Sequence, residues 1–152
     1  KKYEEDNDDY SSIMIKAICD RLAEAFAEYL HKEVRTKYWG YAKDEKTSNE
    51  DLIKEKYSGI RPAPGYPACP DHLEKKTMWD LLSIEERIGV KLTESLAMWP
   101  AASVCGYYFG NKKAKYFGIG KIDQDQMVDY SSRRGINLKE AIKWLNPIYN
   151  DV

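Results

Sequence analysis

The most restrictive feature of the sequence is a proline-rich segment, RPAPGYPACPDH, which runs from Arg61 to His72. Four of the six prolines in the chain fall between Pro62 and Pro70. Proline lacks a backbone N–H and restricts the residue before it, so this segment cannot form a regular helix or a central strand. We therefore expect an ordered, extended loop, with the regular elements of the fold on either side of it.

The composition is that of a folded domain. The chain has 152 residues, of which 43% are hydrophobic and 12% aromatic. This excludes a disordered or low-complexity chain and supports one ordinary domain, or a piece of a larger protein, with a buried core. The 24 Lys and Arg and 25 Asp and Glu give a net charge of −1. Nucleic-acid binding is therefore not expected, because it requires an excess of positive charge on one face.

The sequence also bears on the location of the protein. No apolar stretch approaches the ~20 residues that span a bilayer, and no signal-peptide pattern opens the chain. We therefore expect a cytoplasmic protein without membrane contact. The first residue is not Met, so we expect an excised segment or a processed chain.

Helical periodicity dominates the pattern. Residues 1–10 are acidic and expected to be flexible, and residues 11–152 are expected to form a single domain. A long amphipathic helix is predicted from about Ser11 to Tyr38, capped by Ser11 or Ser12, because apolar residues recur at steps of three and four. Shorter helices are predicted over 48–56, 76–88, 123–134 and 137–145. The residues of the apolar stripe on the long helix are Ile15, Ile18, Leu22, Ala25, Phe26, Tyr29 and Leu30.

Strands are predicted in the second half of the chain. Residues 90–93, 103–109 and 116–122 are rich in aromatic and β-branched side chains. The turn signal GNKKA after residue 109 predicts a hairpin between the last two segments. The order of helices, hairpin and helices predicts an α+β fold, in which an antiparallel sheet with a central β-hairpin is flanked by helices.

The proline-rich segment is the best candidate for a binding site. Arg61 offers a planar fork suited to a carboxylate or phosphate. A loop stiffened by prolines can present its carbonyls, and the N–H groups of Ala63, Gly65 and Tyr66, at little further entropic cost. Gly65 allows close approach of the backbone. The pattern is equally consistent with a binding site for a small polar ligand that has an anionic end and with a crossing loop that has only a structural role.

The sequence gives weaker support for other kinds of functional site. Cys69, Asp71 and His72 could be combined into a metal or nucleophile site, but ordinary loop residues explain them better, and three cysteines form a poor disulfide framework. No nucleophile elbow, zinc-protease motif, P-loop or dinucleotide-binding motif is present. We therefore expect neither a metal site nor a complete catalytic site. Tyr116 and Phe117 open a predicted strand and could face either the core or a ligand.

The segment from Arg61 to His72 resembles the signature of the C-terminal activation domain of cobalamin-dependent methionine synthase. Further segments resemble the same family in the same order, so that the similarity extends from about Ser11 to Leu145. These are residues 21–31 (RLAEAFAEYLH), 38–41 (YWGY), 93–103 (TESLAMWPAAS), 115–117 (KYF) and 125–130 (DQMVDY).

The resemblance implies a function. The family transfers methyl groups from methyltetrahydrofolate to homocysteine through cobalamin, which occasionally oxidises to inactive cob(II)alamin. Its activation domain binds S-adenosylmethionine and docks over the cobalamin-binding domain. With an electron from flavodoxin or a flavoprotein reductase, it supports reductive methylation of the cobalamin. The chain would thus be part of a methyltransferase without being catalytic alone.

Residue roles follow by motif match. The resemblance implies that Arg61 pairs with the carboxylate of S-adenosylmethionine and that the backbone of Ala63–Tyr66 meets its nucleoside end. It also implies that Tyr116 and Phe117 line the same site, with the Tyr116 hydroxyl near the ligand carboxylate. The family module is longer, and its preceding segment supplies an acidic contact to the ligand's amino group.

Two acidic positions, Glu24 and Glu55, match family positions that could lie near the sulfonium or along the docking face. Two alternatives stay open. One is a shortened stand-alone relative that acts only as a docking domain, and the other is an independent small methyltransferase that uses the same ligand.

Overall fold

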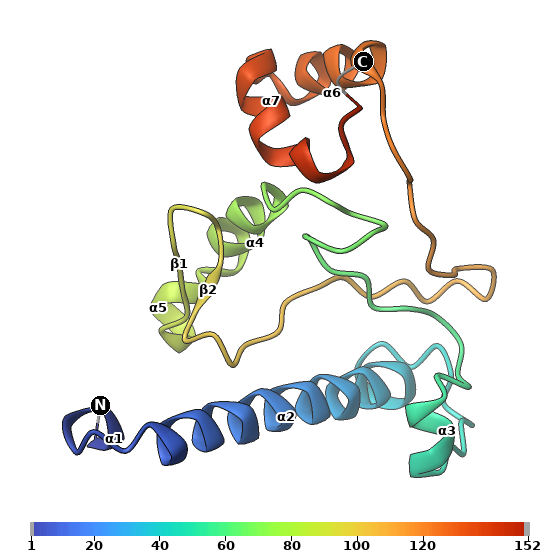
Figure 1. The fold of residues 1–152 in the computed structure, drawn as a ribbon. Coiled ribbons are helices and arrows are strands. Elements are labelled where there is room, and N and C mark those ends of the chain that lie inside the picture. The colour runs from blue at the N-terminus through green and yellow to red at the C-terminus, as the bar shows by residue number, and fades with distance from the viewer. Residues whose placement is uncertain (1, 151–152) are drawn as a thin grey trace.

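A computed structural model describes residues 2–150, and Figure 1 shows three tiers linked by long irregular segments. The helix α2 forms one side, α4, α5 and a short hairpin lie in the middle, and α6 and α7 lie at the far end. The predicted α+β class is confirmed. The elements are α1 (Lys2–Glu5), α2 (Asp9–Glu33), η1 (Val34–Tyr38), α3 (Asn49–Ile53), α4 (Glu74–Leu82), α5 (Ile84–Ile88), β1 (Lys91–Leu92), β2 (Met98–Trp99), α6 (Gln124–Arg134), α7 (Leu138–Leu145) and η2 (Asn146–Ile148).

The long N-terminal helix is confirmed, but its start was misplaced. The side chain of Asp8 accepts a hydrogen bond from the N–H of Ser11 at 3.0 Å, so Asp8 is the cap that we had assigned to Ser11 or Ser12. The helix passes into a π-helical turn, η1, which ends at Tyr38 as predicted. The acidic N-terminus contains the short helix α1, and its flexibility stays a prediction. No helix within residues 2–150 is both long enough and apolar enough to cross a membrane.

The apolar stripe of α2 faces outward over most of its length. Its large side chains are between 43% and 64% exposed, so the described part of the chain covers them only in part. The main buried apolar cluster lies instead at the other end of the molecule, between α6 and α7. The exposed stripe residues are Ile15, Ile18, Leu22, Phe26 and Tyr29, and the buried cluster comprises Ile122, Met127, Ala141 and Leu145.

The predicted hairpin between residues 103–109 and 116–122 is wrong. The antiparallel hairpin is formed by β1 and β2, in which Lys91 pairs with Trp99 and Leu92 with Met98. Of the segments expected to be strands, only 90–93 contributes to this sheet. The other two are extended, but each finds its partner far away in the sequence.

Residues 107–109 lie beside the entrance to the proline-rich loop. The N–H of Tyr107 donates to the carbonyl of Pro62 at 2.9 Å, and Ile60 and Phe109 exchange both backbone hydrogen bonds. A longer ladder cannot form because Pro62 has no N–H to donate. The other segment ends at Ile122, whose N–H donates to the carbonyl of Ile148 at 2.9 Å, beside the C-terminal helices.

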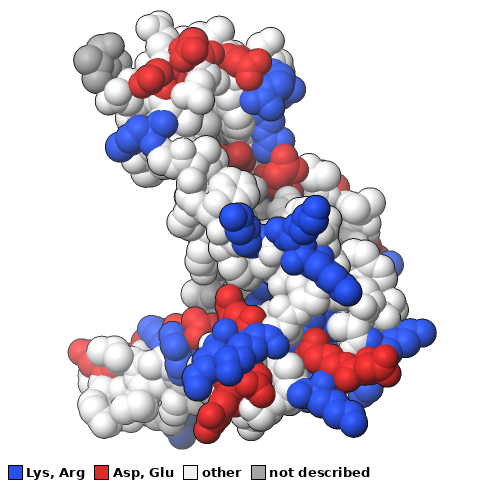
Figure 2. All heavy atoms as spheres, turned by 90° about the vertical axis from the view of Figure 1, so that its right-hand side faces the viewer, with Lys and Arg blue, Asp and Glu red and all other residues white. Residues whose placement is uncertain are grey.

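The shorter helices follow local signals. Ser48 and Asp51 form the predicted capping box of α3. The helix expected over 76–88 is divided into α4 and α5 at Ser83, whose φ of 48° is left-handed. The helices α6 and α7 have the predicted positions, and Asn137 caps α7. Charges of both signs are interspersed on the face that Figure 2 shows.

Candidate functional site

The proline-rich loop is ordered and folds back on itself. The N–H of Gly65 donates to the carbonyl of Cys69 at 2.7 Å, and the N–H of Cys69 donates to the carbonyl of Tyr66 at 2.8 Å. Gly65 has a φ of 96°, and a Cβ atom there would lie 2.1 Å from Cε1 of His72. Only glycine fits this position, because a side chain would meet both a strained backbone and the imidazole ring.

The loop offers a ligand fewer N–H groups than we expected. Gly65 uses its N–H within the loop, and that of Tyr66 points to the carbonyl of Ala63 at 3.4 Å. Among the described residues, the N–H of Ala63 makes no hydrogen bond. Of the three N–H groups expected to face a ligand, only that of Ala63 therefore remains, and the carbonyls of Pro62, Ala63, Tyr66 and Cys69 already accept backbone hydrogen bonds.

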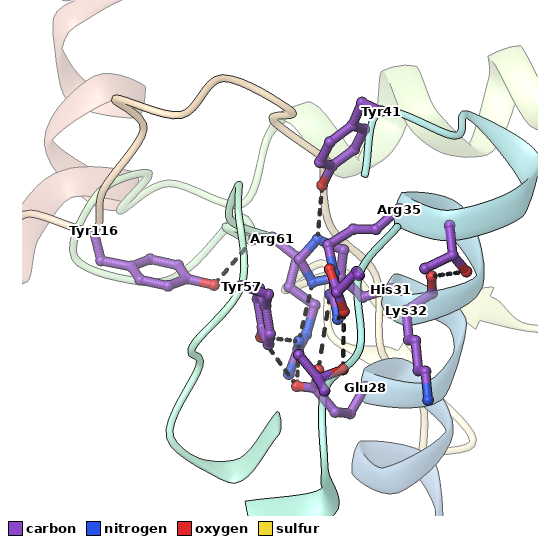
Figure 3. Close-up of polar contacts among 11 residues, drawn as sticks. Glu28, His31, Lys32, Arg35, Tyr41, Tyr57, Arg61 and Tyr116 are labelled. Carbon is purple, nitrogen blue, oxygen red and sulfur yellow. Dashed lines mark hydrogen bonds and ion pairs between the residues drawn. The ribbon is translucent and has the colours of Figure 1, made fainter. Parts of the chain in front are cut away.

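The side chain of Arg61 joins the start of the loop to α2 (Figure 3). Its Nη1 donates to Glu28 Oε2 at 2.6 Å and to the hydroxyl of Tyr57 at 3.2 Å. It also lies 3.4 Å from Nδ1 of His31. Glu28 and His31 reach the same guanidinium because residues three apart on a helix share a face. The side chain of Arg61 is 24% exposed, so one side of it remains open.

Tyr116 reaches the same point from the second half of the chain. Its hydroxyl accepts a hydrogen bond from the backbone N–H of Arg61 at 3.1 Å, although 55 positions separate the two residues. The structure thus brings together two of the residues that the resemblance assigned to the site. Phe117 follows Tyr116 in the chain, and Tyr66 lies within the proline-rich loop. The side chains of Phe117 and Tyr66 are 61% and 66% exposed, respectively.

A buried ion pair between Arg35 and Glu45 lies next to this cluster. The guanidinium of Arg35, which is fully buried, donates to both carboxylate oxygens of Glu45, at 2.7 and 2.8 Å. Its Cζ lies 3.7 Å from the centre of the Tyr57 ring. Arg35 Nη1 is 4.0 Å from Glu28 Oε1, so Glu28 lies between two arginines. Two cations and two carboxylates balance in formal charge, but among the described residues Glu28 Oε1 and Arg35 Nη1 are buried without a hydrogen-bond partner.

His31 is the neutral member of the cluster. Burial, together with the charges of Arg35 and Arg61, lowers its pKa to about 4. Because Arg61 can only donate, Nδ1 of His31 must accept, which leaves the Nε2 proton facing the Tyr41 hydroxyl at 3.4 Å. A neutral imidazole can hold Arg61 in place, whereas an imidazolium would repel it.

The phenol of Tyr57 is likewise protonated. Burial and the charge of Glu28 raise its pKa to about 12. Burial disfavours the charged form of Arg61, but its hydrogen bonds to Glu28 and Tyr57, together with the charge of Glu28, outweigh burial and raise the pKa of Arg61. Arg61 therefore stays cationic and is available to pair with an anion.

The two acidic residues chosen from the sequence lie elsewhere. Glu24 is exposed on α2 and pairs with Arg21 at 3.0 Å, and Glu55 is exposed after α3 with a φ of 50°. Their roles stay a prediction. The acidic residue that contacts Arg61 is Glu28, one helical turn beyond Glu24, and sequence reasoning missed it together with His31 and its aromatic neighbours.

The surroundings of the loop cysteine disfavour its reactive form. Burial and the charges of Asp71 and Glu74 raise the pKa of the Cys69 thiol, which disfavours the reactive thiolate. Within residues 2–150, no three His, Cys, Asp or Glu side chains are grouped so that they could hold a metal ion. The chemistry that the site offers is recognition of an anionic group by Arg61.

Comparison with known proteins identifies the family. Residues 1–135 match the family described as vitamin B12 dependent methionine synthase, activation domain. The chain belongs to this family. A solved structure described as the MetH reactivation domain bound to AdoHcy is 56% identical to it, with a TM-score of 0.95. The match covers 99% of this activation-domain chain but only 46% of that chain, so this chain spans less than half of its solved relative.

Proposed function

We propose that this activation-domain chain binds S-adenosylmethionine and supports the reductive methylation of a cobalamin held by a separate domain. The observation that carries the proposal is the half-buried Arg61, held at the mouth of the proline-rich loop and tied to Tyr116. The solved relative was described with AdoHcy, the demethylated form of the proposed ligand.

The geometry of Arg61 fits a ligand carboxylate. Every hydrogen bond that the described residues make to its guanidinium involves Nη1, which leaves Nη2 and Nε available. Two parallel N–H groups of this kind form the bidentate pair that arginine makes with carboxylates. The contacts with Glu28 and Tyr57 hold the fork before the ligand arrives, so little side-chain entropy is lost on binding.

The remaining ligand contacts are assigned by position. The loop from Ala63 to Tyr66 meets the nucleoside end, and Tyr116 and Phe117 close the site from the opposite side. By motif match, we also assign the exposed Glu24 and Glu55 to contacts with the sulfonium or with the docking face, because a carboxylate stabilises a positive charge.

The chemistry takes place on the cobalamin of the partner domain. When reduced by one electron from flavodoxin or a flavoprotein reductase, the cobalamin would supply the methyl-accepting centre, and S-adenosylmethionine would leave as S-adenosylhomocysteine after giving up its methyl group. This chain binds and orients the methyl donor and supplies no catalytic residue of its own.

Calorimetric titration with S-adenosylmethionine tests the binding. We expect Arg61→Ala to weaken binding by ~1.5–3 kcal/mol, or roughly ten- to a hundredfold, because a charge-assisted contact is lost. Arg61→Lys keeps the charge but not the fork and should restore only part of the affinity. Arg87→Ala, which changes an exposed arginine of α5, is the matched control and should bind as the native chain does.

The role in reductive methylation needs a second assay. The chain is added to a cobalamin-binding domain loaded with cob(II)alamin, with reduced flavodoxin, and the cobalamin absorbance is followed. Formation of methylcobalamin only when the chain and S-adenosylmethionine are both present supports the role. A folded native chain that binds no ligand, or binds only beside the cobalamin domain, favours the docking alternative. Methyl transfer without a cobalamin domain favours the independent methyltransferase.

A further inference from the structure

An arginine from the C-terminal part of the chain forms ion pairs with two residues near the end of the proline-rich loop. Arg134, the last residue of α6, places its guanidinium between Asp71 and Glu74. Its Nη2 lies 3.2 Å from Asp71 Oδ1, and its Nη1 lies 2.5 Å from Glu74 Oε1. The two carboxylates stand where the loop ends and α4 begins, so one side chain joins α6 to both.

Within residues 2–150, few other contacts join α6 to the end of the loop, and the main one is the hydroxyl of Tyr130, which interacts with Asp71 and lies 3.4 Å from Arg134 Nε. The helices α6 and α7 pack on their own apolar cluster, and Figure 1 shows them apart from α2. A crevice of about 370 Å³ lies between this helix pair and the loop residues Ala68–Asp71. Because the crevice interrupts apolar packing, polar contacts fix how the loop lies against α6, and Arg134 makes the ion pairs among them.

The contact between Arg134 and Asp71 also affects the part of the loop that is proposed to meet the ligand. Asp71 is buried, and its Oδ1 also accepts the N–H of Leu73 at 2.7 Å. The next residue, His72, has its ring pressed against the Cα of Gly65, where no Cβ atom would fit. An arginine that holds Asp71 therefore also holds His72, and through it the turn at Gly65.

Loss of the arginine would leave Asp71 with a poorly compensated charge. A buried carboxylate that loses its partner is strongly unfavourable, so the chain would move to hydrate it. Glu74, on the first turn of α4, would lose its partner at the same time. Both movements begin at the end of the loop and displace His72.

We propose that Arg134 is a positioning residue that fixes the ligand-binding conformation of the proline-rich loop from α6. Among the described residues its polar contacts are with Tyr130, Asp71 and Glu74, not with Arg61. Its effect on S-adenosylmethionine rests on the proposed function, but its effect on the loop does not.

Hydrogen exchange without ligand tests the proposal in the full chain. The N–H groups of Gly65 and Cys69, which close the turn within the loop, report on it directly. In Arg134→Gln, which loses two charge-assisted hydrogen bonds, we expect both to exchange at least about tenfold faster, while amides in the middle of α2 keep their native rates. Arg134→Lys should restore part of the protection.

The matched control is the neighbouring residue. Arg133 lies on the same helical turn but is exposed, and it pairs only with Asp129 at 2.9 Å among the described residues. Arg133→Gln removes the same charge and should leave Gly65 and Cys69 at native rates. Native exchange of these amides in Arg134→Gln would overturn the proposal, as would equal acceleration throughout α2, which indicates general loss of stability.

A milder variant covers the case in which Arg134→Gln does not fold. Glu74→Gln removes one of the two ion pairs and should accelerate the same amides by a smaller factor; unchanged rates there contradict the proposal. Calorimetry then separates the two claims. If the native chain binds S-adenosylmethionine and Arg134→Gln binds equally well, the positioning role fails and the proposed function stands. If neither the native chain nor any variant binds S-adenosylmethionine, the proposed function fails, and the exchange rates still decide the positioning role.

Discussion

The neutral state of His31 makes the stability of the chain depend on pH in a specific direction. The pKa of this buried imidazole is about 4, against an ordinary value of 6.5. Between these two pH values the His31 imidazole is largely protonated in the unfolded chain and largely neutral in the folded chain. The free energy of unfolding is therefore highest above pH 6.5 and falls as the pH drops from 6.5 towards 4.

The size of the effect follows from the shift. A difference of about 2.5 pKa units corresponds to at most about 3.4 kcal/mol if the whole interval is crossed. Between pH 7.0 and 5.5, linkage gives a loss of about 1.2 kcal/mol. This window is informative because Asp and Glu side chains titrate mainly below it.

Denaturant unfolding followed by tryptophan fluorescence measures the loss. The chain has only two histidines, and burial also lowers the pKa of His72, so the variant His72→Gln isolates His31. We expect His72→Gln to lose about 1.2 kcal/mol between pH 7.0 and 5.5, and the double variant with His31→Asn to lose much less. If the double variant does not fold, proton NMR of the native imidazoles decides the question. A pKa near 6.5 for His31, or equal stability at the two pH values, would refute the reasoning.

Three further predictions concern the support of the site and the exposed helix face. Glu45→Gln leaves the buried Arg35 without its bidentate partner, and we expect a loss of about 3–5 kcal/mol in unfolding free energy by urea titration; a loss below 1 kcal/mol would contradict this. Ser48→Ala removes the cap of α3 and should cost about 1 kcal/mol in the same assay, while a neutral result would show that α3 does not unfold with the rest. The exposed stripe of α2 should make the chain self-associate in analytical ultracentrifugation, and Leu22→Glu should reduce this; a chain that is monomeric at every concentration would contradict it.

The success of the sequence analysis depended on how local each signal is. The positions of α2, α6 and α7 follow from apolar periodicity and from end signals such as Asn137, which act within a few residues. The hairpin failed because strand pairing depends on distant partners. Residues 107–109 have the composition of a strand, but their partner is the segment 60–62, which no local pattern indicates.

The site was predicted in part for the same reason. Arg61 and its loop stand out because prolines and arginine have distinctive chemistry. Glu28 and His31 lie about 30 positions away from Arg61 on a helix whose polar face looks solvated. Their burial depends on the chain returning to α2, so the sequence pattern gave no sign of it. The i,i+3 spacing of an acidic residue and a histidine was the one available hint.

The central claim is that Arg61 and the adjoining loop form the S-adenosylmethionine site. The most direct measurement is a two-dimensional ¹H–¹⁵N NMR titration of the chain with this ligand, including the Arg61 Nε–H signal. We expect large shifts for Arg61 Nε–H, the Ala63 amide and residues 116–117, with α7 unaffected. Shifts confined to other parts of the chain, or saturable binding that leaves Arg61 unchanged, would contradict it.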